Sequence, residues 1–327
     1  MIAYLAVSFF ISLFFTSIVL WAIIPRLKKM GMVGHDVNKP DRPEVAEMGG
    51  IGIIAGMALG ILVSIFFNTF LGFQFNLDFV LAALVSVFII AFIGFVDDLL
   101  DIPQAVKAFL PLLAGIPLIA LRAAGSTTMY VPFMGQVDFG MVYLFVAIPI
   151  GIAVASNLTN MLAGFNGLEA GMGAVALCAA AIAALLLGST DALVIYIPLI
   201  GALLGFLVFN RFPARIFPGD VATLMIGATL AAGSIVGNFE ALAALLLIPY
   251  VVDFFIKAAN RFPSSNWWGE FKGGKLYPVE GRVRGFAQLV MKLASGISES
   301  NLVLFFVLLE ALVSALVLLA FFKVKIF

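Results

Sequence analysis

Ten apolar runs, each about as long as a bilayer-spanning helix, constrain this chain more than any other feature. A hydrocarbon core of about 30 Å takes roughly 20 apolar residues as a helix. Composition agrees, since 63% of the 327 residues are hydrophobic and only 11% are charged. We therefore expect an all-α integral membrane protein of about ten transmembrane helices. The expected spans are residues 2–24, 49–71, 79–96, 107–122, 141–157, 168–188, 191–209, 220–237, 239–258 and 300–322.

Most connections between these spans are short, which favours one polytopic membrane domain over residues 1–327. The longer connections are residues 25–48, 123–140 and 259–299. We interpret 259–299 as a long loop within the domain. Residues 126–140 alternate weakly around turn residues near Gly135, which predicts a small β-hairpin on the outer side.

Lysine and arginine fall almost entirely on one side of the predicted spans. Fifteen of the 18 lie in connections that follow odd-numbered spans. Because cytoplasmic loops are enriched in these residues, we expect the odd connections, and any active site on them, to face the cytoplasm. Short loops favour a prokaryotic plasma membrane, or the endoplasmic reticulum membrane if the chain is eukaryotic.

Composition also limits the chemistry of a site. A net charge of zero gives no case for a nucleic acid partner. A single cysteine, Cys178, and a single histidine, His35, exclude an intramolecular disulfide and a histidine or cysteine metal cluster. A metal here needs oxygen ligands, which points to Mg²⁺, with Mn²⁺ as the alternative.

Three aspartates, Asp97, Asp98 and Asp101, close the third apolar run in the sequence GFVDDLLD. They lie at a helix C-terminus, where the backbone dipole is already negative. A solvated loop explains one such residue, but three at a membrane boundary indicate a functional site. Lys107 opens the next span on the same side, so a metal-bound phosphate would satisfy both the carboxylates and the lysine. Taken alone, Lys107 is equally well explained as a lysine at a helix end whose ammonium reaches out to water.

Two later loops on that side are also polar. The stretch NLTNMLAGFNGLEAG, residues 157–171, suits either turns or a site whose asparagines contact a nucleobase or a metal. In NRFPARIFPGDVATL, residues 210–224, Asp220 stands at an expected helix start, where an N-cap role is sufficient to explain it. Phe217 in the same loop suits either interfacial packing or stacking on a base.

Two acids lie within other spans. Asp253 precedes Lys257 by four residues, a spacing that predicts an ion pair on one helix face. Glu310, near the middle of the tenth span, has no partner that the sequence identifies.

Taken in order, DDLLD (97–101), Lys107, NLTNMLAGFNGLEAG (157–171) and ARIFPGD (214–220) resemble the polyprenyl-phosphate N-acetylhexosamine-1-phosphate transferases. The spelling LAGFNGLEAG is most similar to the dolichyl-phosphate N-acetylglucosamine-1-phosphate transferases of eukaryotes and archaea. HDVNKPDRPEVAEMGG and ESNLVLFF fit the same branch. The resemblance covers nearly the whole chain.

This resemblance implies a reaction and its partners. A sugar 1-phosphate, expected to be N-acetylglucosamine 1-phosphate, passes from a UDP-sugar to a polyprenyl or dolichyl phosphate in the bilayer. UMP is released, and the product starts a lipid-linked glycan. Mg²⁺ is the implied cofactor, and a homodimer is left open.

The resemblance also implies residue roles. Asp97 and Asp98 correspond to the reactive acidic pair, and Lys107 to a lysine that faces the phosphates. Asp220 and Asn160 correspond to the residues that hold Mg²⁺ against the pyrophosphate.

The uridine site is implied in the same way. Phe217 corresponds to the aromatic residue that stacks on uracil, with Gly164 and Asn166 beside it. Glu47 and the backbone around Val37 line the site.

One loop departs from the family pattern. Relatives carry a basic cluster near the sugar and pyrophosphate, whereas this chain reads ANRFPSSNWW from Ala259 onward. Arg261 is the best match to one of those basic residues, so the identity of the sugar stays open.

Other functional classes explain less of the sequence. An ion-coupled transporter could use the acidic cluster as a cation site, but it predicts acids near the bilayer midplane and often repeated halves. An intramembrane aspartyl protease needs a Gly-x-Gly-Asp pattern, and FPGD lacks the first glycine. A binding scaffold without catalysis leaves the four ordered motifs unexplained.

Overall fold

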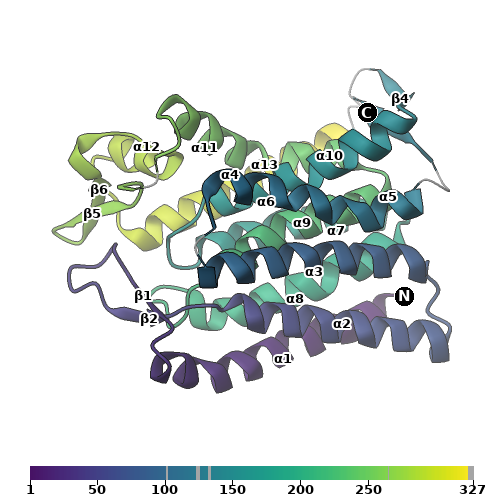
Figure 1. The fold of residues 1–327 in the computed structure, drawn as a ribbon, viewed down its shortest axis with the longest axis horizontal. Helices are drawn as coiled ribbons and strands as arrows, with labels where there is room; N and C mark the ends of the chain where they lie inside the picture. The colour runs from purple at the N-terminus through teal and green to yellow at the C-terminus, as the bar shows by residue number, and fades with distance from the viewer. Residues whose placement is uncertain (101, 123–125, 132–133, 264, 323–327) are drawn as a thin grey trace.

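The computed structural model describes residues 1–100, 102–122, 126–131, 134–263 and 265–322, so Asp101 lies outside the described residues. Helices make up most of this part of the chain, with three small two-stranded sheets at its ends (Figure 1). Nine described helices are long and apolar enough to span a bilayer, and a bent pair brings the number to ten. The prediction of an all-α membrane protein with about ten spans is confirmed.

Most predicted spans are single helices whose ends differ slightly from the expected ones. They are α1 (Ile2–Lys29), α2 (Gly50–Leu71), α3 (Leu77–Leu100), α7 (Leu168–Leu186), α8 (Thr190–Asn210), α9 (Gly219–Gly237) and α13 (Glu299–Phe322). The extension of α3 matters most, because it puts Asp97 and Asp98 on the last turns of a helix and not in a loop.

Two spans are broken at prolines, which lack the N–H that a continuous helix needs. The fourth consists of α4 (Gln104–Phe109), the 3-10 helix η1 (Leu110–Gly115) and α5 (Ile116–Arg122), with Pro111 in η1 and Pro117 in α5. The ninth divides into α10 (Glu240–Leu246) and α11 (Ile248–Ala259), which meet at a 59° bend beside Pro249. The fifth span joins a short π-helix, η2 (Tyr143–Ala147), to α6 (Ile148–Met161).

Three antiparallel hairpins connect the helices. They are β1 (Val33–His35) with β2 (Glu44–Ala46), β3 (Thr128–Val131) with β4 (Gly135–Asp138), and β5 (Gly269–Lys272) with β6 (Lys275–Pro278). The pair β3–β4 confirms the hairpin predicted within 126–140. The other two pairs, the turn η3 (Val279–Gly281) and the helix α12 (Phe286–Leu293) belong to the two long connections on the opposite side.

The two ends of the helical bundle differ in what they carry. Figure 1 shows β1, β2, β5, β6 and α12 gathered at one end, and β3–β4 and the start of α1 at the other. We call the first the loop end. The connections that follow odd-numbered spans lie there together, as alternating spans require. That the loop end faces the cytoplasm stays a prediction.

Candidate active site

Three charged side chains from separate helices converge at the loop end. The ammonium of Lys107 on α4 lies 2.5 Å from Oδ2 of Asp97 on α3 and also pairs with Oδ2 of Asp220 on α9. All three are largely shielded, with side-chain exposures of 15% for Lys107, 9% for Asp97 and 24% for Asp220. We call them the carboxylate–lysine cluster. The structure thus brings together three residues that the sequence singled out from three different motifs.

A glycine allows α3 to approach the start of α9 closely. A Cβ at Gly94 would lie 2.6 Å from the backbone nitrogen of Val221, closer than real Cβ atoms come to other atoms. Because Gly94 is one turn before Asp97, this crossing sets the Asp97 side chain beside Asp220. Asp97 is fixed further by its Oδ1, which accepts the backbone N–H of Ile102 at 2.9 Å.

Asp98 lies against the N-terminus of α9. Its Oδ1 accepts the backbone N–H of Asp220 at 2.8 Å. The N-terminus of a helix has unsatisfied N–H groups and partial positive charge, so a carboxylate there is stabilised. The interpretation of Asp220 as an N-cap is wrong, since α9 begins at Gly219 and its N-cap position, Pro218, makes no side-chain cap bond. Asp98 supplies a capping oxygen from another helix.

The side chain of Asn160 lies next to the cluster on α6. Its Nδ2 is 3.5 Å from Oδ2 of Asp220, and its Oδ1 accepts the hydroxyl of Thr223 at 2.8 Å. Sequence reasoning missed Thr223. Its position three residues after Asp220 was the available signal, because residues at that spacing share one helix face.

The donors around Asp220 suit a hard cation. The oxygens of Asp97 and Asp220 already converge on one cation, the Lys107 ammonium. Among the described residues, no three carboxylate, imidazole or thiolate groups form a complete metal site. That is compatible with Mg²⁺, which commonly uses one or two carboxylates and takes its other oxygens from water and substrate phosphates. Asn160 would have to turn its amide to present Oδ1 to the same ion.

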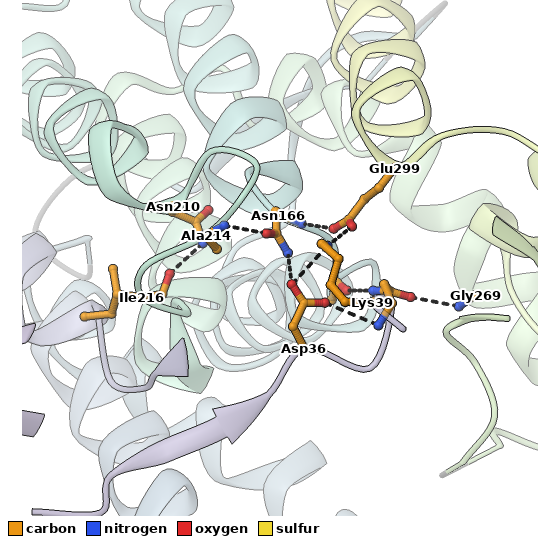
Figure 2. A network of polar contacts seen from close by, with 10 residues as sticks. Asp36, Lys39, Asn166, Asn210, Ala214, Ile216, Gly269 and Glu299 are labelled. Carbon is orange, nitrogen blue, oxygen red and sulfur yellow. Dashed lines mark hydrogen bonds and ion pairs between the residues drawn. The ribbon is translucent and has the colours of Figure 1, made fainter. Parts of the chain in front are cut away.

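Asn166 sits in a second polar network, drawn in Figure 2, and is only 4% exposed. Its Nδ2 donates to Oδ2 of Asp36 at 3.1 Å, and its Oδ1 accepts the backbone N–H of Ala214 at 2.6 Å. Its own backbone N–H donates to Oε1 of Glu299 at 2.8 Å. Asn166 therefore joins the loop after α6 to three segments that are distant in sequence.

A lysine completes this network. Lys39 pairs with Oδ2 of Asp36 at 3.0 Å and with Glu299, and both acids are 3% exposed at the side chain (Figure 2). Asn38 donates to the carbonyl of Gly164 at 2.9 Å and accepts the N–H of Gly269 at 3.0 Å. Sequence reasoning gave these residues no role. The signal was their place in the motifs HDVNKP and ESNLVLFF.

The other sequence-predicted residues lie around the same loops. Val37 occupies the turn between Asp36 and Asn38 and is half-buried. Phe217 donates its N–H to the carbonyl of Ala46 at 2.7 Å, which ties the loop before α9 to β2.

Glu47 and Arg261 are exposed, as is Asp98 among the other predicted residues. The Glu47 carboxyl lies against Gly34, and partial burial there raises its pKa despite the opposing charge of His35. Arg261 lies in the turn after α11. Within the described residues, no contact joins it to the carboxylate–lysine cluster.

The predicted pair in the ninth span is confirmed. Lys257 lies 2.8 Å from Oδ2 of Asp253 and also donates to the carbonyl of Met161. Asp253 in turn accepts the backbone N–H of Phe286 at 2.7 Å, which fixes the start of α12. Glu310 is fully buried on α13, and neither of its oxygens has a hydrogen-bond partner among the described residues.

Comparisons with known proteins agree with this arrangement. A family model described as glycosyl transferase family 4 matches residues 80–238, a range that contains the whole carboxylate–lysine cluster. A protein of Saccharolobus solfataricus, named as a proposed UDP-N-acetylglucosamine–dolichyl-phosphate N-acetylglucosaminephosphotransferase, is 38% identical over 289 residues, which cover 88% of this chain and 86% of the relative.

More distant relatives come from two branches. A Schizosaccharomyces pombe protein named UDP-N-acetylglucosamine–dolichyl-phosphate N-acetylglucosaminephosphotransferase is 28% identical, covering 73% of this chain and 63% of the relative. A phospho-N-acetylmuramoyl-pentapeptide-transferase of Halalkalibacterium halodurans is 32% identical, covering 63% of this chain and 65% of the relative. These matches favour a transferase over the transporter alternative and confirm the resemblance carried by the motifs. The chain belongs to glycosyl transferase family 4.

Proposed function

We propose that the chain transfers N-acetylglucosamine 1-phosphate from UDP-N-acetylglucosamine to a polyprenyl or dolichyl phosphate and releases UMP. The observation that carries this proposal is the convergence of Asp97, Lys107 and Asp220 at the loop end of a largely apolar helical bundle. A lipid phosphate reaches such a place from the bilayer, while a nucleotide sugar reaches it from water. The names of the archaeal and fungal relatives support the same substrates.

In the proposed reaction, an oxygen of the lipid phosphate attacks the phosphorus that carries the sugar. The new P–O bond forms as the pyrophosphate bond to UMP breaks. The attacking oxygen is already anionic at neutral pH, so the main barrier is repulsion between two phosphates. Enzymes that catalyse phosphoryl transfer generally lower this barrier by positioning the reacting groups and neutralising their charge.

Lys107 is the residue placed to neutralise this charge. Its ammonium lies between two carboxylates, Asp97 and Asp220, which hold it in position before substrate arrives. When a phosphate enters, Lys107 donates to the phosphate oxygens and its contacts with the carboxylates loosen. Asp97 then remains beside the attacking lipid phosphate.

Mg²⁺ is the proposed cofactor, with Asp220 and Asn160 as its protein ligands. When bound, it would neutralise the pyrophosphate and stabilise charge on the departing UMP. Asp98 holds the backbone of Asp220 in place and thereby orients that ligand.

The uridine is proposed to bind at the loop containing Gly164 and Asn166, with Phe217 stacking on the base. Both Nδ2 and Oδ1 of Asn166 already have protein partners, so we assign its side chain to holding this loop in place and not to binding the base. The loop end is proposed to face the cytoplasm of a plasma membrane. Cleavage of the 259–299 segment by protease in right-side-out vesicles but not in inside-out vesicles would contradict that orientation.

The direct test is to incubate the purified protein in lipid nanodiscs with UDP-N-acetylglucosamine, dolichyl phosphate and Mg²⁺, and to measure UMP release. We expect UMP and a lipid-linked pyrophosphoryl sugar, with activity lost in Asp97→Asn and Asp220→Ala. Failure to release UMP, or full activity in both variants, would contradict the proposal. Coupled ion transport into proteoliposomes without UMP release would favour the transporter instead.

A further inference from the structure

The backbone of Gly164 is already engaged by the protein on both of its polar groups. Its N–H donates to Oε1 of Glu169 at 2.5 Å, and its carbonyl accepts from Nδ2 of Asn38 at 2.9 Å. Its φ of +102° is a conformation that favours glycine. A ligand that contacts Gly164 can therefore reach only its Cα surface.

The indole of Trp267 covers that surface. A Cβ built on Gly164 would collide with Cζ3 and Cη2 of the indole and lie 3.5 Å from its Cε3. Trp267 comes from the 259–299 loop, the one region where the sequence departs from the family pattern. The structure therefore shows what this part of the loop contacts.

The backbone on either side of Trp267 is held firmly. Buried Gln288 donates to the carbonyls of Asn266 at 2.7 Å and Trp268 at 2.8 Å. Buried Asn38, which binds Gly164, also accepts the N–H of Gly269 at 3.0 Å. The position of the loop relative to Gly164 is thus set by hydrogen bonds that do not involve the indole.

The side chain of Trp267 is held less firmly than its backbone. It is half-buried, and its ring makes an edge contact with Trp268 at a centroid distance of 5.8 Å. No hydrogen bond from its indole N–H occurs among the described residues. Because the hydrogen bonds that hold the loop do not involve the indole, a rotation of this side chain would leave all of them intact.

We propose that the Trp267 indole is a removable cover of Gly164, and that the uracil of the nucleotide sugar replaces it there. This inference rests on the proposed function, which puts the uridine at Gly164. The indole and a pyrimidine base are both flat aromatic rings, and Gly164 offers either of them a surface without a side chain. Trp267 is then a specificity residue, because a ligand must supply enough stacking to displace it.

The cover has a thermodynamic consequence. A ligand that binds only the uncovered form has its apparent Kd raised by the reciprocal of the uncovered fraction. If roughly 10 to 30% of molecules are uncovered at rest, removing the ring should tighten nucleotide binding about three- to tenfold. Trp267→Ala removes the cover, and Trp267→Phe is the matched control because it keeps a flat ring.

The test measures UMP binding in nanodiscs by calorimetry and by tryptophan emission. For emission, Trp21→Phe and Trp268→Phe leave Trp267 as the one tryptophan of the chain. We expect Trp267→Ala to bind UMP about three- to tenfold more tightly, Trp267→Phe to stay near wild type, and UMP to shift the Trp267 emission toward that of a water-exposed indole.

Two results would overturn the inference while leaving the proposed function intact: UMP binding by Trp267→Ala that is no tighter than that of wild type, or an unchanged Trp267 emission at saturating UMP. In either case the Trp267 ring would stay on Gly164 when UMP binds. If neither wild type nor Trp267→Ala binds UMP, the proposed function fails and this inference fails with it.

Discussion

The carboxylate of Asp98 accepts the backbone N–H of Asp220 at 2.8 Å, across 122 positions of sequence. One aspartate of the acidic pair therefore caps α9, while its neighbour Asp97 binds Lys107. The two adjacent acids therefore have different roles: Asp98 fixes the backbone at the start of α9, and Asp97 forms an ion pair within the carboxylate–lysine cluster.

This division predicts different outcomes at Asp98. Asp98→Ala should lower the free energy of unfolding by about 1 kcal/mol, the usual cost of losing an N-cap oxygen. Asp98→Asn keeps an oxygen that can accept the Asp220 N–H and should stay close to wild type in thermal unfolding. Equal melting temperatures for wild type and Asp98→Ala would contradict the capping role.

Lys107 should affect turnover more than folding. Lys107→Met removes the charge placed to face the phosphates, and we expect UMP release to fall on the order of a hundredfold or more, as for other lost electrostatic contacts at transferring groups. Lys107→Arg keeps the charge and should retain part of the activity. Lys107→Met leaves both Asp97 and Asp220 without their cation. The double variant Lys107→Met with Asp97→Asn removes one of these two unpaired charges, so it should recover part of the lost stability without activity.

Lys39 should matter for stability and nucleotide binding. Lys39→Met leaves two buried acids, Asp36 and Glu299, facing each other without a cation. Breaking a buried ion pair costs about 3–5 kcal/mol, so we expect a large drop in melting temperature and weaker UMP binding. Adding Glu299→Gln should restore part of the loss.

An exposed pair on the same side of the molecule provides the control for Lys39. Lys272 pairs with Glu270 on β5, where the two side chains are 63% and 42% exposed. Lys272→Met should change the free energy of unfolding by about 1 kcal/mol or less. If both lysine variants unfold at the same temperature, the buried network does not stabilise the fold.

Glu310 should be dispensable for folding. It is 0% exposed, and its carboxyl oxygens have no hydrogen-bond partner in the described part of the chain. An unpaired buried polar group costs stability, so Glu310→Leu should match or exceed wild type in melting temperature. Asp253→Leu is the contrasting variant, because it breaks the pair with Lys257 and should destabilise. A melting temperature below that of wild type for Glu310→Leu would contradict this expectation.

Removal of divalent metal should abolish transfer. Treatment with EDTA should stop UMP release, and added Mg²⁺ should restore it. A ligand that binds only the folded state stabilises it by about 2.7 kcal/mol at a hundred times its Kd. Mg²⁺ with UMP should therefore raise the melting temperature of wild type more than that of Asp220→Asn, which keeps the proposed uridine site but loses a metal ligand. Undiminished UMP release in EDTA would exclude a required metal.

The sequence by itself was sufficient for the spans, the predicted hairpin and the candidate residues. Apolar runs of bilayer length leave few alternatives to helices, because backbone groups in lipid must hydrogen-bond within their own segment. The four motifs named the residues that converge, including Asp97, Lys107 and Asp220. Apolar runs and short motifs are local in sequence, so they can be recognised without knowledge of which helices pack together.

The tertiary structure alone decided how those residues are partnered. Asp98 caps a helix 122 residues away, Asn166 binds Asp36 across 130, and Lys39 reaches Glu299 across 260. No periodicity or spacing encodes such pairs, because they depend on which helices cross and how closely. Gly94 allows one such helix crossing, and Gly164 leaves room for the indole of Trp267. In both places a side chain on the glycine would collide with its neighbour, and only the tertiary structure shows which neighbour that is.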